Sequence, residues 1–305
     1  MRLSPKWLPP ILVLLGLRYA AAADDLPGYL PPDTKVVLGV QVRTIVDSLS
    51  QTLGAELRGQ ITAALAQTPL AGFDPLKDLD EILIASTGKG NNPPTLVVLR
   101  GRFDVPRLAA KAKPYQGVPV IDSGQPSQGV LALLDGATAI AGEPPMVRAA
   151  IDRQRKGAHP KFAWAGRTDS LRQKYAVWGV GDIPEKPKAA AGQAGPLDSL
   201  DRFEFGAAFS NGLELTADLH PRSPADLEKM AQTLRMLVAM IEAKAPASKG
   251  SQFALSAGNG TLRLSVRIPQ ADLNQAMEAQ RAGRHQQDLR PTQEGIPSDR
   301  TEPGL

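Results

Sequence analysis

The stretch DPLKDLDEILIA at residues 74–85 decides how the chain is organised, because it joins an acidic lead-in to an apolar run. The run returns as TLVVL at residues 95–99, as the second arm of a hairpin would. A similar segment, GPLDSLD at residues 195–201, precedes two further apolar runs at residues 203–209 and 213–219. Self-similarity at this scale is evidence of architecture. The sequence therefore predicts a hairpin-plus-helix unit that occurs twice.

Turn-forming pairs separate other apolar runs, at Asp135-Gly136, Asn211-Gly212 and Asn259-Gly260. Such pairs suit the positive-φ turns of tight hairpins, so we expect a type I′ turn at Asp135-Gly136. Consecutive hairpins favour antiparallel sheets with helices laid on them. The predicted class is α+β, built from duplicated antiparallel hairpin-plus-helix units whose helices pack on an antiparallel sheet.

Three residues are predicted to start helices. Thr44 precedes apolar positions that recur every four residues from Ile45 to Ile61, as on one helix face. Asp104 precedes a helical segment at residues 105–113, and Ser223 is followed by Pro224 at the first helical position. Short polar side chains cap the free amide groups of a helix N-terminus, and proline is favoured directly after the cap.

Residues 1–23 have the order of a secretory signal peptide. Arg2 and Lys6 precede an apolar run at residues 8–17, and the small residues Ala20 to Ala23 come before Asp24. Because a membrane helix needs about 20 apolar residues, we expect cleavage near Ala23 and a periplasmic or secreted protein. A retained membrane anchor is the alternative.

The remaining chain divides at the repeat. We expect a first half at residues 24–157, a second half at residues 158–283 and a disordered tail at residues 284–305, which carries few apolar side chains. A loose linker is predicted at residues 184–192. Sequence leaves the packing of the two halves and the oligomeric state open.

Composition excludes several functions. The 305 residues contain no cysteine, which removes disulfides, thiol catalysis, thiolate metal sites and a lipid-bearing cysteine. The formal net charge is +4, and it falls to +1 when Arg2, Lys6 and Arg18 leave with the signal. Such a small charge does not indicate a nucleic-acid partner.

Three segments resemble those of an uncharacterised family of exported bacterial proteins, known only as domains of unknown function. They are PPDT at residues 31–34, FDPLKDL at residues 73–79 and YQGVPV at residues 115–120. The resemblance covers residues 26–155. It implies export and a shared fold, and it implies no activity.

No catalytic signature, metal site or cofactor site is expected. The cluster of Asp74, Asp78, Asp80 and Glu81 lacks the glycine and the alternating carboxylates of a calcium loop. The three histidines are scattered, and none lies four residues from another. The enzyme alternative is a periplasmic hydrolase whose site is assembled from distant carboxylates.

One segment, residues 146–174, is strongly basic. It holds eight cationic side chains against two carboxylates, with Phe162 and Trp164 among them. Basic side chains with interleaved aromatic rings suit an anionic polymer or membrane surface. We therefore expect a non-enzymatic binding protein that contacts an anionic envelope component or membrane surface. The candidate residues are Arg148, Arg153, Arg155, Lys156, Lys161, Trp164 and Arg167.

Two structural roles would also account for the basic segment. Its cations can complement a helix C-terminus and line a solvated connector. They can also pair with the acidic lead-ins at residues 74–81 or 198–204, as a clasp between the halves.

A second unusual segment is the helix expected at residues 225–244. Met236 and Met240 fall opposite its main apolar face, which gives it a broad apolar arc. We expect this helix to be sandwiched between two layers of the protein.

Overall fold

The computed structural model describes residues 26–50, 73–88, 93–122, 129–158, 161–184, 199–244, 250–275 and 278. The predicted signal at residues 1–23, the tail at 284–305 and most of the linker at 184–192 lie outside these residues. Residues 270–275 and residue 278 are helical.

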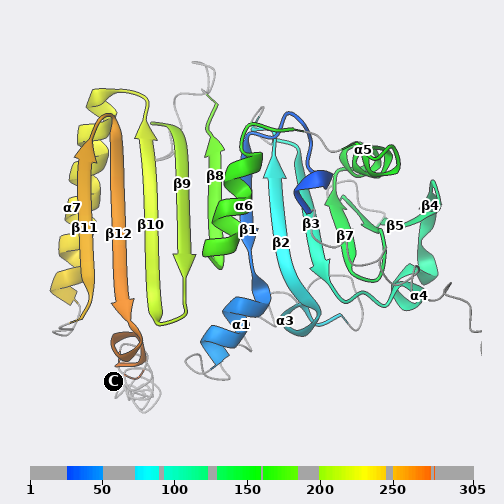
Figure 1. Ribbon diagram of the computed structural model, residues 1–305, viewed down its shortest axis with the longest axis horizontal. Coiled ribbons are helices and arrows are strands. Elements are labelled where there is room, and N and C mark those ends of the chain that lie inside the picture. The colour runs from blue at the N-terminus through cyan, green and yellow to red at the C-terminus, as the bar shows by residue number, and fades with distance from the viewer. Residues whose placement is uncertain are drawn as a thin grey trace, which may run out of the picture.

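Twelve strands form one antiparallel sheet in the order β11-β12-β10-β9-β8-β1-β2-β3-β7-β6-β5-β4 (Figure 1). The α+β prediction is confirmed. The strands are β1 (Val36–Val40), β2 (Leu79–Ser86), β3 (Thr95–Gly101), β4 (Lys113–Tyr115), β5 (Val118–Asp122), β6 (Val130–Leu133), β7 (Thr138–Gly142), β8 (Val177–Asp182), β9 (Leu200–Ala208), β10 (Gly212–Pro221), β11 (Gln252–Gly258) and β12 (Thr261–Pro269).

Helices pack on both faces of the sheet. In Figure 1, α5 and α6 cover one face, and α7 lies on the other face behind β11 and β12. The helical segments are η1 (Leu26–Tyr29), α1 (Val42–Ser50), α3 (Pro75–Asp78), α4 (Val105–Leu108), η2 (Ala109–Lys111), α5 (Pro144–Arg155), α6 (Ala165–Lys174) and α7 (Pro224–Lys244).

The strands form one continuous sheet because β1 pairs with β8 in its middle. Val37 lies opposite Val180, and Gly39 lies opposite Trp178. The Trp178 ring is fully buried and fills the space above Gly39. A Cβ at Gly39 would lie 2.1 Å from that ring, so only glycine fits there.

The main core lies between the sheet and helices α5 and α6. Val147, Ala150 and Ile151 are fully buried on α5, at the spacing of one helix face. Leu171 of α6 joins the same cluster, which includes Trp178 of β8. A smaller cluster on Leu79, Phe103, Leu133 and Ala139 packs with the side chains of α4.

The helix-start predictions have different outcomes. The Asp104 side chain accepts a hydrogen bond from the amide of Arg107, and the Ser223 hydroxyl accepts one from the amide of Asp226, so both caps are confirmed. The Thr44 prediction is wrong, because α1 begins at Val42. The amide of Ile45 already donates to the carbonyl of Gln41, which places Thr44 inside the first turn.

The predicted turn type at Asp135-Gly136 is also wrong, although the hairpin between β6 and β7 exists. Neither residue is among those with positive φ. Instead, one Asp135 carboxylate oxygen accepts from the amides of Ala137 and Thr138, each at 2.7 Å. This Asx geometry makes a longer loop. At Asn259-Gly260 both φ values are positive, as in a type I′ turn.

The prediction that α7 is sandwiched between two layers is wrong for the described residues, among which only the sheet packs on it. Met236, Leu237, Met240 and Ile241 are 65%, 41%, 45% and 48% exposed. Ala231 of the same helix is buried. Among the described helices, none combines the length and the apolar character that a membrane crossing requires.

Candidate functional site: the cationic surface of α5

Helix α5 fixes the orientation of the first cations in the basic segment. Pro144 and Pro145 start the helix, and its buried face turns Arg148 and Arg155 towards solvent. Lys156 follows as the C-terminal cap. Cations at this end of a helix also complement its macrodipole.

The β4–β5 hairpin is fastened to α5. The guanidinium of Arg148 lies 5.3 Å from the ring centroid of Tyr115, a cation–π contact. The Tyr115 hydroxyl donates to the two carboxylate oxygens of Asp152 at 3.2 and 3.3 Å, and the Gln116 amide donates to one of them at 2.6 Å. The hairpin and the helix therefore present one connected surface.

This attachment adds a residue that sequence reasoning missed. Lys113 is exposed and lies two residues before Tyr115 in β4. Alternate residues of a strand share a face, so Lys113 projects on the same side as the ring that contacts α5. The period-two spacing of Lys113 and Tyr115 is the signal that could have revealed it.

Arg153 does not take part in this surface. It is partly buried, and its Nη2 donates to the carbonyl of Tyr29 at 2.9 Å. Its Nε is buried without a hydrogen-bond partner among the described residues. Desolvation lowers the pKa of Arg153, although the charges of Asp33 and Asp152 oppose the change. This arginine holds α5 against the N-terminal segment.

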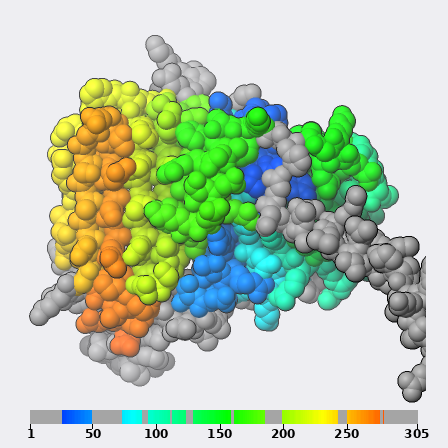
Figure 2. All heavy atoms as spheres, in the orientation of Figure 1, coloured from blue at the N-terminus to red at the C-terminus, as the bar shows by residue number. Residues whose placement is uncertain are grey.

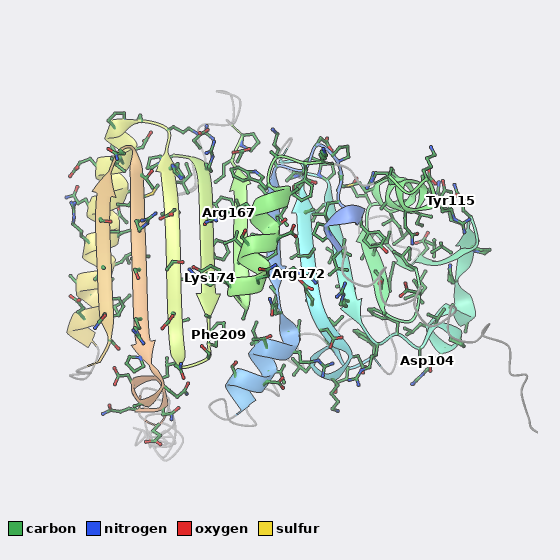
Figure 3. All side chains as sticks on the ribbon, viewed as in Figure 1. Asp104, Tyr115, Arg167, Arg172, Lys174 and Phe209 are labelled. Carbon is green, nitrogen blue, oxygen red and sulfur yellow. The ribbon has the colours of Figure 1, made fainter. Side chains whose placement is uncertain are left out.

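The arginines of α6 pair with acidic residues of the sheet. Arg167 Nε donates to Glu204 of β9 at 2.6 Å, and this hydrogen bond raises the pKa of Arg167. Arg172 donates to both carboxylate oxygens of Glu81 in β2, at 2.6 and 2.7 Å. Since β8 and β1 lie between β9 and β2, α6 bridges four neighbouring strands (Figure 3).

Of these two pairs, only Arg172–Glu81 joins residues 158–283 to residues 24–157, as the predicted clasp would, because Arg167 and Glu204 both lie within residues 158–283. Both acidic partners come from the lead-in segments of the two hairpins. Figure 2 shows α6, in green, covering this central part of the sheet.

Trp164 belongs to the core rather than to an exposed surface. It is partly buried and packs against the main cluster. The guanidinium of Arg202 lies 5.2 Å from its ring centroid. Its indole N–H is buried and has no hydrogen-bond partner among the described residues. Phe162, beside it in sequence, is only 7% exposed.

Lys174 of α6 is exposed, and its ammonium lies 4.9 Å from the ring centroid of Tyr175. On β4, on α5 and just after α5, five further exposed cations form no ion pair in the described part of the chain. We refer to them as the α5 cationic surface, although Lys161 lies in the connection from α5 to α6. They are Lys113, Arg148, Arg155, Lys156 and Lys161.

A polar cleft between α1 and α6 bears on the enzyme alternative. Its volume is about 600 Å³, and its lining includes Asp80, Glu81 and Asp169. Two of these carboxylates are already held by guanidinium groups, since Asp80 pairs with Arg43 and Glu81 with Arg172. This arrangement neutralises the acids instead of freeing them for proton transfer.

The acidic lead-in before β2 has a structural role. Residues Pro75–Asp78 form one helical turn, and the Asp74 side chain accepts from the amide of Leu76. Lys77 lies 2.8 Å from Asp74, and its hydrogen bond lowers the pKa of that carboxyl. Within the described ranges, no three His, Cys, Asp or Glu side chains lie close enough to hold a metal ion.

Comparison with known proteins shows a shared fold alone. No family model matches the chain, and no curated protein matches it. The solved structure titled "Structure of crystal form I of TP0453" matches with a TM-score of 0.52 and 10% identity, covering 85% of this chain and 98% of that one. Crystal form IV of TP0453 matches with a TM-score of 0.47 and 11% identity, covering 84% and 98%. The resemblance to exported domains of unknown function stays a prediction.

Proposed function

We propose that this chain is an exported, non-enzymatic binding protein that contacts an anionic surface of the cell envelope through the α5 cationic surface. The observation that carries the proposal is the set of five exposed cations without a carboxylate partner among the described residues. Asp152, the acid closest in sequence to Arg148, Arg155 and Lys156, accepts hydrogen bonds from the side chains of Tyr115 and Gln116.

The electrostatic free energy that these five cations can contribute indicates how tightly the protein would bind an anionic membrane. A lysine or arginine near an anionic membrane contributes about 1 kcal/mol, so five supply about 5 kcal/mol. That corresponds to a dissociation constant between millimolar and micromolar. The contact is therefore weak, reversible and sensitive to salt, as suits a protein that docks on an extended surface.

Anionic vesicles provide the direct test. We expect the protein to bind vesicles of phosphatidylglycerol but not of phosphatidylcholine, and to be released by salt, which screens exposed charges beyond about 8 Å at physiological ionic strength. The quadruple variant Lys113→Gln, Arg155→Gln, Lys156→Gln and Lys161→Gln should lose binding. Its free energy of unfolding should stay within about 0.5 kcal/mol of the parent, because surface changes are usually that small.

A matched control removes the same number of exposed cations elsewhere, with Arg107→Gln, Lys229→Gln, Arg235→Gln and Arg267→Gln. Equal loss of binding in both variants would assign the attraction to net charge and overturn the proposed surface. Retention of an anionic polymer such as heparin without vesicle binding would place the partner among envelope polymers rather than lipids.

Export is part of the same proposal and rests on the signal-like order of residues 1–23. The mature chain then begins near Asp24, and N-terminal sequencing of protein from the extracytoplasmic fraction should find that start. An intact Met1 in that fraction would indicate a retained anchor. Protein confined to the cytoplasm would contradict export.

We also infer that the two halves are copies of one unit. Strand order supports this: β1, β2, β3, β7 and β6 extend from the centre in one direction, as β8, β9, β10, β12 and β11 do in the other. The unequal helices α4 and α7 after the first hairpin of each half mark where the copies diverged.

A further inference from the structure

The two edges of the sheet differ in how they resist another strand. The edge strand β4 has three residues and carries Lys113 and Pro114. Proline removes a backbone donor, and a charged lysine on an edge discourages pairing with other chains. This edge is therefore protected in the manner of natural sheet edges.

The opposite edge strand, β11, has none of these features. Its seven residues, QFALSAG, contain no charge and no proline. It pairs with β12 along its whole length, from Gln252 opposite Arg267 to Gly258 opposite Thr261, without a register shift. Among the described strands none pairs with its outer side. A long, regular and uncharged edge is a template for a further strand.

The open backbone donors and acceptors of β11 can pair with another β-strand. The sequence of β11 is compatible with antiparallel pairing to β11 of a second copy. In an antiparallel pair centred on Leu255, Phe253 lies opposite Ala257 and Ala254 lies opposite Ser256. Large side chains then face small ones, and no charges oppose each other. The register keeps Phe253 and Leu255 on the face that carries Val266 and Leu264 of β12.

A second feature lies at the same end of the molecule. Helix α7 packs on β11 (Figure 1). Its exposed side chains include Met236, Leu237, Met240 and Ile241. Contiguous apolar side chains on a surface are typical of interaction sites. An open strand edge and an apolar helix therefore occur together, away from the α5 cationic surface.

We propose that β11 pairs antiparallel with β11 of a second copy of this chain, which joins the two twelve-stranded sheets into one. The two-fold axis is perpendicular to the sheet, so the same face of both copies lies on one side of the dimer. Both α5 helices then lie on that side. The interface itself uses no residue of the α5 cationic surface and does not depend on the proposed function.

Sedimentation or light scattering of the full chain tests the dimer. The expected mass is twice the 32.4 kDa of one chain. The variant Ala254→Lys with Ser256→Lys places lysine opposite lysine at two positions across the interface. It should weaken the dimer by about tenfold or more, because directly opposed like charges are destabilising.

Two further variants make the test specific. Ala254→Glu with Ser256→Lys places opposite charges at the same two positions and should restore the dimer, which establishes the register. The control Ser170→Lys with Ala225→Lys adds the same charge on exposed helix positions and should leave the dimer intact.

Cross-linking gives a readout that does not depend on stability. Because the chain has no cysteine, Leu255→Cys introduces one thiol at the proposed two-fold axis. It should give a covalent dimer on oxidation, and Ser265→Cys on β12 should not. A monomer at all concentrations, or a dimer that the opposed lysines leave unchanged, would overturn the proposal.

Discussion

Arg172 and Glu81 lie 91 residues apart in sequence and form a bidentate ion pair with N···O distances of 2.6 and 2.7 Å. The Glu81 residue is only 5% exposed. The pair connects α6 to β2 of the first hairpin. The neighbouring residue in β2, Asp80, forms a more exposed ion pair with Arg43.

Removal of Arg172 leaves a buried carboxylate without its charged partner. We expect Arg172→Ala to lower the free energy of unfolding by about 3–5 kcal/mol, as for other broken buried pairs. Urea denaturation measures this loss. The matched control is Arg43→Ala, whose guanidinium side chain is 51% exposed and whose pair should contribute about 0–1 kcal/mol. Equal losses in the two variants would contradict the structural role assigned to Arg172.

The contact between Gly39 and Trp178 gives a second prediction. A methyl group at Gly39 would meet the buried indole at 2.1 Å, so Gly39→Ala should destabilise the protein by about 1–3 kcal/mol or more through overpacking. Gly166 is the control, because it lies in α6 with nothing within 4 Å of an added Cβ. Gly166→Ala should stabilise by about 0.5 kcal/mol. A neutral Gly39→Ala would show that the β1–β8 junction can relax.

Some features of the fold could be predicted from local sequence, and others could not. Local signals were sufficient at Asp104 and Ser223, where a short polar side chain and its neighbours determine a helix start. They failed at Asp135, because its carboxylate bonds to two amides and produces a longer loop than the Asp-Gly pair predicts. The pairing of Gly39 with Trp178 depends on strands 139 residues apart in sequence, which no local pattern encodes.

For the candidate site, the sequence predicted a segment rich in cations but not which of those cations are exposed. Sequence identified a basic segment, but it could not separate Arg155, which is exposed, from Arg153, which is partly buried against Tyr29. That separation follows from which face of α5 packs on the sheet. Arg167 is not part of the α5 cationic surface because the fold brings Glu204 of β9 next to it. Lys113 is part of that surface because the fold places β4 beside α5.

The pair of Asp218 and Arg263 predicts a pH dependence. The Arg263 hydrogen bond lowers the pKa of Asp218 below its ordinary value of 3.8. A carboxyl with a lowered pKa in the folded state contributes stability above its unfolded pKa, and this stability is lost as the pH falls through the folded pKa. Asp218→Asn should therefore be less stable than the parent at neutral pH.

The difference between Asp218→Asn and the parent should shrink as the pH falls below 3.8. Urea unfolding at a series of pH values measures it. Parallel curves for the two proteins would show that the bond between Asp218 and Arg263 contributes no net stability in solution.

The last prediction connects the edge strand to the anionic surface. In the proposed dimer both α5 cationic surfaces lie on one side, so one vesicle can contact both, and linked contacts bind more tightly than either alone. Ala254→Lys with Ser256→Lys adds positive charge to each chain, which by itself strengthens attraction to anionic lipid. We nevertheless expect it to bind phosphatidylglycerol vesicles about tenfold more weakly than the parent, because it separates the copies. Ser170→Lys with Ala225→Lys adds the same charge without disturbing β11, and it should bind at least as well as the parent. Tighter binding by both variants would mean that each copy docks independently.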